Sequence, residues 1–123
     1  MIAYTEAEKL LPELNDNRAA GELYTEIGNI YRNNYDYSKC LEAYQTACDF
    51  YTKAGLESDV AYTLLNIGIA YWNLEDNAKG IEYINEALQM ALKLQDEYLE
   101  MVCYQNIVFL CDDIDAVGRC GSI

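Results

Sequence analysis

The sequence contains no histidine and only one proline in 123 residues. Without histidine, the chain lacks the usual general base, the usual metal ligand and the side chain that changes charge near neutral pH. Seven glycines and one proline supply few turns, and alternating runs of β-branched residues are absent. This composition argues against an all-β sandwich or barrel and against histidine-dependent catalysis.

Basic residues are also scarce, because 8 Lys and Arg stand against 21 Asp and Glu and give a net charge of −13. Such a surface repels phosphate groups, so nucleic acid and anionic membranes are poor partners. No apolar run approaches the roughly 20 residues of a membrane span. The first residues lack a basic region followed by an apolar run, so we expect no signal peptide and a cytoplasmic location.

Five cysteines occur, an odd number, and none of them forms a C-x-x-C pair. A secreted disulfide framework or a zinc site is therefore not expected, and a reducing compartment fits best. The acidic segment 112–118 starts like a calcium loop but has no closing glutamate. We predict no metal and no cofactor. Cys40, Cys48 and Cys111 fall on apolar phases and are expected to pack as small hydrophobic residues, whereas Cys120 could form an intermolecular disulfide.

An internal repeat organises the chain. Residues 21–60 align with residues 61–100 without gaps, and 10 of these 40 positions are identical. The identical pairs are Ile27/Ile67, Gly28/Gly68, Tyr31/Tyr71, Asn33/Asn73, Asp36/Asp76, Lys39/Lys79, Glu42/Glu82, Ala47/Ala87, Lys53/Lys93 and Glu57/Glu97. A constant spacing of this size is typical of a solenoid of stacked units.

Each repeat has the hydrophobic periodicity of two helices. Apolar residues recur at i, i+3, i+4 and i+7, which predicts helices over 17–33, 37–54, 58–74, 77–95 and 97–114. Asp36 and Asp76 are placed to cap second helices, and Gly55 is placed to end one. A glycine inside a helix costs about 1 kcal/mol relative to alanine. Gly28 and Gly68 therefore indicate close approach of a neighbouring helix.

The pattern resembles the tetratricopeptide repeat, with an apolar residue, an Ile-Gly pair, a tyrosine, then a small residue, an aromatic or apolar residue and an alanine. Its copies here are Tyr24, Ile27, Gly28, Tyr31, Cys40, Tyr44, Ala47, then Leu64, Ile67, Gly68, Tyr71, Gly80, Ile84, Ala87, and partly Tyr104, Ile107, Val108, Cys111. The 40-residue spacing is similar to the long-repeat branch of that family, which includes peptide receptors, sensory modules and scaffolds. The resemblance implies an all-α, right-handed α-solenoid of stacked antiparallel hairpins.

The predicted array covers residues 1–115. It comprises a half repeat at 1–15, repeats at 17–56 and 57–96, and the first helix of a further repeat at 97–114, followed by a flexible tail at 116–123. Val108 replaces the glycine in the third copy, so that helix is expected to sit differently against its neighbour. Because the pattern starts and stops within repeats, the sequence resembles a piece of a longer array.

The resemblance further implies that first helices line a concave, ligand-binding face. The predicted binding residues lie between the core positions of these helices: Asn29, Arg32, Tyr62, Leu65, Asn66, Ile69, Trp72, Asn73, Gln105, Asn106 and Phe109. In the long-repeat family, asparagine at the place of Asn66 and Asn106 often holds a peptide backbone. The alternative is a structural hydrogen bond or cap.

The apolar members of this set are expected to form extra exposed surface. Exposed apolar patches usually mark interaction sites, although self-association through open ends could also bury this one. Arg32 is the only basic residue on these faces, which argues against a clamp for a C-terminal carboxylate. Glu22, Glu26, Asp112 and Asp113 favour a protein or peptide ligand that is apolar with basic flanks.

The sequence therefore predicts a non-enzymatic, protein- or peptide-binding scaffold. Two alternatives stay open at this stage. One is a peptide-sensing regulatory domain of a larger regulator, and the other is an architectural segment that mediates homo-oligomerisation. The fold hosts many functions, so fold alone does not choose among them.

Overall fold

The computed structural model describes residues 13–114, with side chains over residues 16–109, as five consecutive α-helices. The helices are α2 (Glu13–Asn33), α3 (Tyr37–Lys53), α4 (Glu57–Asn73), α5 (Asn77–Leu94) and α6 (Glu97–Ile114). The predicted ranges differ by at most one residue from α3 to α6, whereas α2 begins four residues before the predicted start at 17. The proposed tail at 116–123 and most of the half repeat at 1–15 lie outside the described residues.

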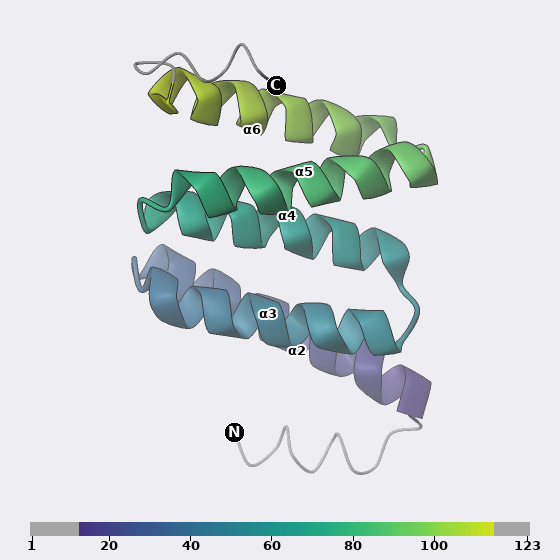
Figure 1. Cartoon of the computed structure of the whole chain (residues 1–123). Coiled ribbons are helices and arrows are strands. Elements are labelled where there is room, and N and C mark those ends of the chain that lie inside the picture. The colour runs from purple at the N-terminus through teal and green to yellow at the C-terminus, as the bar shows by residue number, and fades with distance from the viewer. Residues whose placement is uncertain (1–12, 115–123) are drawn as a thin grey trace.

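The helices form a stack of antiparallel hairpins, which confirms the predicted all-α solenoid (Figure 1). Helix α2 packs on α3, α3 on α4, α4 on α5, and α5 on α6. In Figure 1, α3 lies in front of α2, and the stack rises from this hairpin to α6 at the opposite end. The first helices of successive units are therefore α2, α4 and α6, and the second helices are α3 and α5.

From α3 to α5, each helix with its turn occupies 20 residues, so that α3, α4, α5 and α6 begin at 37, 57, 77 and 97. Each of the four turns between the helices contains one residue with positive φ. These residues are Tyr35, Gly55, Glu75 and Gln95. A residue in the left-handed conformation commonly ends a helix, and glycine adopts this conformation at the lowest cost in free energy. The 40-residue repeat is thus two 20-residue units of equal length.

Aspartates cap three of the helices. The backbone N–H of Lys39 donates to Asp36 Oδ1 and that of Lys79 donates to Asp76 Oδ1, both at 3.2 Å. These two bonds confirm the predicted caps. Asp96 Oδ1 accepts from the Leu99 N–H at 3.1 Å in the same way at the start of α6.

Gly28 and Gly68 stand where helices approach closely, as predicted. A Cβ added at Gly28 would lie 2.6 Å from the Tyr44 ring, and one at Gly68 would lie 2.5 Å from Ile84 Cγ1 and 2.8 Å from the Gly80 oxygen. Any larger side chain would force the second helix of the hairpin away. These contacts fix the spacing within each hairpin.

The core consists of two clusters. One joins α4, α5 and α6 through Ala61, Leu64, Leu65, Ile84, Ala87, Leu88, Ala91, Leu99, Cys103 and Ile107. The other joins α3 and α4 through Cys40, Tyr44, Ile67 and Ala70. Each second helix packs between two first helices, and the clusters couple one unit to the next.

Candidate functional site

The predicted binding residues are distributed over the three first helices. Helix α2 carries Asn29 and Arg32, and α6 carries Gln105, Asn106 and Phe109. Helix α4 carries the other six. We call the side of the stack formed by α2, α4 and α6 the first-helix face.

An aromatic pair joins α4 to α6 on this face. The Trp72 and Phe109 rings meet edge to face, with centroids 4.9 Å apart and an interplanar angle of 65°. Trp72 is half-buried, whereas Phe109 is 54% exposed. Aromatic pairs in this geometry attract each other, and their exposed edges offer apolar area to a ligand.

A polar contact joins the same two helices near their N-termini. The Tyr62 hydroxyl donates to Asp96 Oδ2 at 3.3 Å, and burial together with the Asp96 charge raises the pKa of Tyr62. Asp96 thus serves both the α6 cap and the α4–α6 junction. The two helices are held together at both ends of their contact.

The expectation that all five apolar residues add exposed surface is wrong for Leu65, which is only 5% exposed. Leu65 belongs to the core cluster that includes Leu99 and Cys103 of α6. Tyr62, Ile69 and Trp72 are partly buried against that cluster. The reason is that α6 packs beside α4 and covers side chains that helical phase alone assigns to the open face.

The asparagines differ in their hydrogen bonding. Asn106 Nδ2 donates to the Val102 oxygen at 2.8 Å, and Asn73 Nδ2 donates to the Ile69 oxygen at 2.9 Å, so both amides bond to their own helices. Asn66 is half-buried, and its amide has no hydrogen-bond partner among the side chains and backbone that the structure describes. Asn66 can therefore offer a donor and an acceptor together.

On α2, Asn29 has a structural partner, because its Oδ1 accepts the hydroxyl proton of Tyr44 from α3. This bond satisfies the hydroxyl of a tyrosine that is almost fully buried. Arg32 is exposed in the last turn of α2, and Gln105 is exposed on α6. In the described structure, no hydrogen bond, ion pair or ring contact joins Arg32 or Gln105 to α4.

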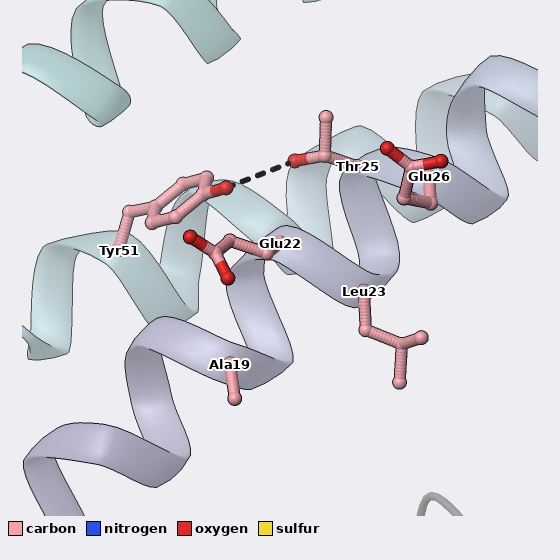
Figure 2. A pocket seen from close by; sticks show the side chains of 6 residues that line it. All are labelled: Ala19, Glu22, Leu23, Thr25, Glu26 and Tyr51. Atoms are coloured by element: carbon pink, nitrogen blue, oxygen red, sulfur yellow. Dashed lines mark hydrogen bonds between the residues drawn. The ribbon is translucent and has the colours of Figure 1, made fainter.

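A hollow of about 540 Å³ lies between α2 and the end of α3. It is lined by Ala19, Glu22, Leu23, Thr25, Glu26 and Tyr51. Figure 2 shows the Tyr51 hydroxyl directed at Thr25, with the Glu22 carboxylate beneath the ring and the Glu26 carboxylate farther along α2. The two hydroxyls lie 3.3 Å apart, and Thr25 Oγ1 also donates to the Gly21 oxygen at 2.8 Å.

The hollow has an acidic rim over a partly apolar floor. Burial raises the pKa of Tyr51, so its hydroxyl stays protonated and neutral. Glu22 pairs with Arg18 at 3.5 Å, but both side chains are more than half exposed, and such pairs contribute little stability. A basic ligand group could therefore compete with Arg18 for Glu22. The sequence identifies Glu22 and Glu26 as acidic residues of this region, but it does not identify the contribution of Tyr51.

The described part of the chain shows neither a reactive cysteine nor a metal site. Cys40 and Cys103 are fully buried, and burial raises the pKa of both thiols, that of Cys103 to about 11. Thiols of this kind are poor nucleophiles. Residues 13–114 contain no cluster of cysteine or carboxylate groups suited to a metal ion, and none of their helices has the length and apolar character needed to cross a bilayer. Cys111 and Cys120 lie outside the described side chains.

The fold places the chain in a class, the helical-repeat modules. Within that class, the chain belongs to the soluble NSF attachment protein (SNAP) family, whose family model matches residues 1–99. Members of this family have a helical repeat similar to the tetratricopeptide repeat and are non-enzymatic adaptors. The predicted resemblance is thus confirmed at the level of the repeat, whereas its long-repeat branch stays a prediction. Searches of curated proteins and of solved structures gave no significant match.

Proposed function

We propose that the chain is an adaptor that binds an extended segment of another protein along its first-helix face. The bound segment has an apolar centre and basic flanks. The observation that carries this proposal is the Trp72–Phe109 pair, because it presents a half-open aromatic surface at the junction of two helices. Aromatic side chains at such junctions supply much of the binding energy in protein interfaces.

The negative charge of the first-helix face favours a ligand with basic flanks. Glu22 and Glu26 line the hollow on α2, and only Arg18 pairs with either of them in the described structure. A lysine or arginine of the ligand would replace an exposed ion pair that contributes little. A net charge of −13 would also speed the approach of a basic segment at low salt.

Asn66 supports an extended backbone in the ligand. Asn66 lies on α4, next in sequence to the buried residues Leu65 and Ile67, and is itself only half-buried. One amide can accept from a peptide N–H and donate to a peptide oxygen, which fixes direction and register without selecting side chains. Selectivity would then come from the aromatic pair and the acidic hollow.

The family's name describes attachment to NSF, which makes NSF the first protein partner to test. Purified NSF and the full chain should co-sediment, and the complex should weaken when Phe109→Ala removes the exposed half of the aromatic pair. Co-sedimentation that Phe109→Ala leaves intact would assign NSF binding to another surface.

The binding mode itself is tested by selecting peptides from a random phage library on the full chain. The selected peptides should have an apolar centre with Lys or Arg on either side. Their affinity should fall by about tenfold or more in Trp72→Ala and Phe109→Ala, as expected for interface aromatics. Tyr98→Ala is the matched control, since it removes an exposed aromatic from the first turn of the same helix.

Circular dichroism should show unchanged helicity in Phe109→Ala, because this side chain is more than half exposed. Selection of acidic peptides, or equal losses in Phe109→Ala and Tyr98→Ala, would contradict the proposed mode.

A further inference from the structure

Helix α6 has an apolar face that nothing in the described chain covers. Met101, Tyr104 and Val108 lie at i, i+3 and i+7, and each is between 47% and 59% exposed. We call these three residues the open face of α6. Three large apolar side chains on one helical stripe exceed the isolated exposed residues that ordinary surfaces carry.

The repeat register shows what this stripe corresponds to in the complete hairpins. Position 108 is equivalent to Gly28 and Gly68, which lie against Tyr44 of α3 and Ile84 of α5. Position 101 is equivalent to Gly21 and Ala61, and Gly21 lies against the Tyr51 ring of α3. In both complete hairpins this stripe therefore faces the second helix.

The opposite side of α6 is already occupied. Leu99, Cys103 and Ile107 are buried in the cluster that α6 shares with α5. Ile67, which is equivalent to Ile107, is likewise buried against the preceding second helix, in the cluster with Cys40 and Tyr44. The open face is thus the hairpin face of a first helix, and its geometry suits a helix.

The open face differs in shape from its equivalents. Where α2 and α4 have Gly21, Gly28, Ala61 and Gly68, α6 has Met101 and Val108. In the complete hairpins the first helix supplies the small residues, and the second helix supplies Tyr44, Tyr51 or Ile84. Here the large side chains come from α6, so a close-packed partner must have small residues at the facing positions.

The charge of α6 indicates which charge a binding partner should carry. The helix has Glu97 and Glu100 in its first turn, Asp112 and Asp113 near its end, and no basic residue. A second copy of α6 in antiparallel pairing would bring these acidic ends together, at a cost from like-charge repulsion. A partner with basic residues at its ends would instead be attracted.

We propose that the open face of α6 docks an amphipathic helix that has alanine or glycine opposite Met101 and Val108 and basic residues at its flanks. This helix takes the place that α3 and α5 take on α2 and α4. The surface is separate from the aromatic pair of the proposed function, so the two can fail independently.

The test uses the full chain and stapled helical peptides based on the α5 segment Asn77–Leu94, a natural second helix. Two peptides carry Glu82→Lys and Glu86→Lys, since both glutamates are exposed in α5, and a third peptide keeps both glutamates. Of the two lysine-bearing peptides, one keeps Ile84 and the other carries Ile84→Ala. Fluorescence anisotropy measures the binding of each peptide to the wild type, Val108→Ala and Val108→Gly.

The wild type should bind the Ile84→Ala peptide about tenfold more tightly than the Ile84 peptide, because overpacking Val108 against isoleucine is costly. Val108→Gly should reverse this preference, and Val108→Ala, which keeps helix propensity, should reduce it. A peptide that retains Glu82 and Glu86 should bind more weakly at low salt. Equal affinities in all proteins, or no binding, would overturn the proposal.

Self-association is measured in parallel by analytical ultracentrifugation. A monomer in the absence of peptide supports the proposal. A dimer that Met101→Lys dissolves, but Tyr35→Lys in the α2–α3 turn does not, would overturn it and assign the face to a second copy of the chain.

Discussion

At the scale of single residues, the hairpins depend on a glycine placed opposite a large side chain. Gly28 faces Tyr44 and Gly68 faces Ile84, although glycine is a poor residue inside a helix. Close packing against the second helix therefore compensates for the low helix propensity of these two glycines. The same argument explains why the third copy, with Val108, does not present the same surface.

Gly68→Ala should destabilise the fold by about 1–3 kcal/mol, because overpacking outweighs the gain of about 1 kcal/mol in helix propensity. The added methyl would lie 2.8 Å from the backbone oxygen of Gly80, which cannot rotate away. Urea unfolding followed by circular dichroism measures the change. Ser58→Ala, in an exposed position of α4, is the control and should change stability by less than about 0.5 kcal/mol. Increased stability of Gly68→Ala would refute the close contact.

Alkaline pH should destabilise the protein through two buried groups. Burial raises the pKa of Tyr44 from 10.0 to about 12 and that of Cys103 from 9.0 to about 11. The unfolded chain loses these protons at lower pH than the folded chain. The stabilisation is therefore complete below pH 9 and is lost as pH rises, from 9 to 11 for Cys103 and from 10 to 12 for Tyr44.

The Tyr44 contribution should amount to about 2 kcal/mol between pH 10 and 12. Tyr44→Phe should flatten the decline of unfolding free energy in that window, although it also removes the bond to Asn29. Tyr35→Phe is the control, because the Tyr35 ring is 79% exposed. An unchanged decline in Tyr44→Phe would show that Tyr44 titrates alike in the folded and unfolded chains.

At the scale of elements, the chain from α3 to α5 is a series of 20-residue units, each a helix followed by a turn with a left-handed residue. Only one of the four turn residues is glycine, namely Gly55. Tyr35, Glu75 and Gln95 adopt the same region at a cost of roughly 1–2 kcal/mol each. Replacing these three residues by glycine should therefore increase the free energy of unfolding.

Glu75→Gly should stabilise the protein by about 0.5–1 kcal/mol, because glycine removes the left-handed strain but adds entropy to the unfolded chain. The reciprocal change, Gly55→Ala, should destabilise by about 1 kcal/mol, since nothing lies near its Cβ and only the backbone is strained. Both are measured by thermal unfolding. Opposite signs are required, and a Glu75→Gly variant that melts earlier than the wild type would contradict the account.

The sequence predicts helix limits well here because caps and hydrophobic phase agree. Asp36 and Asp76 start their helices where predicted, and only the start of α2 is misplaced by more than one residue, since Pro12 before it in the sequence has no side chain that could cap a helix. The left-handed turn residues were missed because tyrosine, glutamate and glutamine carry no glycine signal. Such positions follow from the equal length of the units and not from local propensity.

At the scale of the molecule, the site was predicted less well than the fold. The helical phase correctly assigns Trp72 and Phe109 to neighbouring first helices, and the structure brings their rings together. It fails for Leu65, which the packing of α6 covers, and it does not anticipate the hollow under Tyr51. Both failures concern contacts between elements, which a period along one helix does not encode.

The account centres on ligand binding by the first-helix face, and Trp72, the single tryptophan of the chain, reports on it directly. The decisive measurement is the indole N–H signal of ¹⁵N-labelled full-length chain, titrated with a peptide from the phage selection. We expect this signal to shift together with backbone amides of α4 and α6 and of the segment around Glu22 and Glu26. An unmoved indole signal, with shifts confined to α3 and α5, would contradict the account.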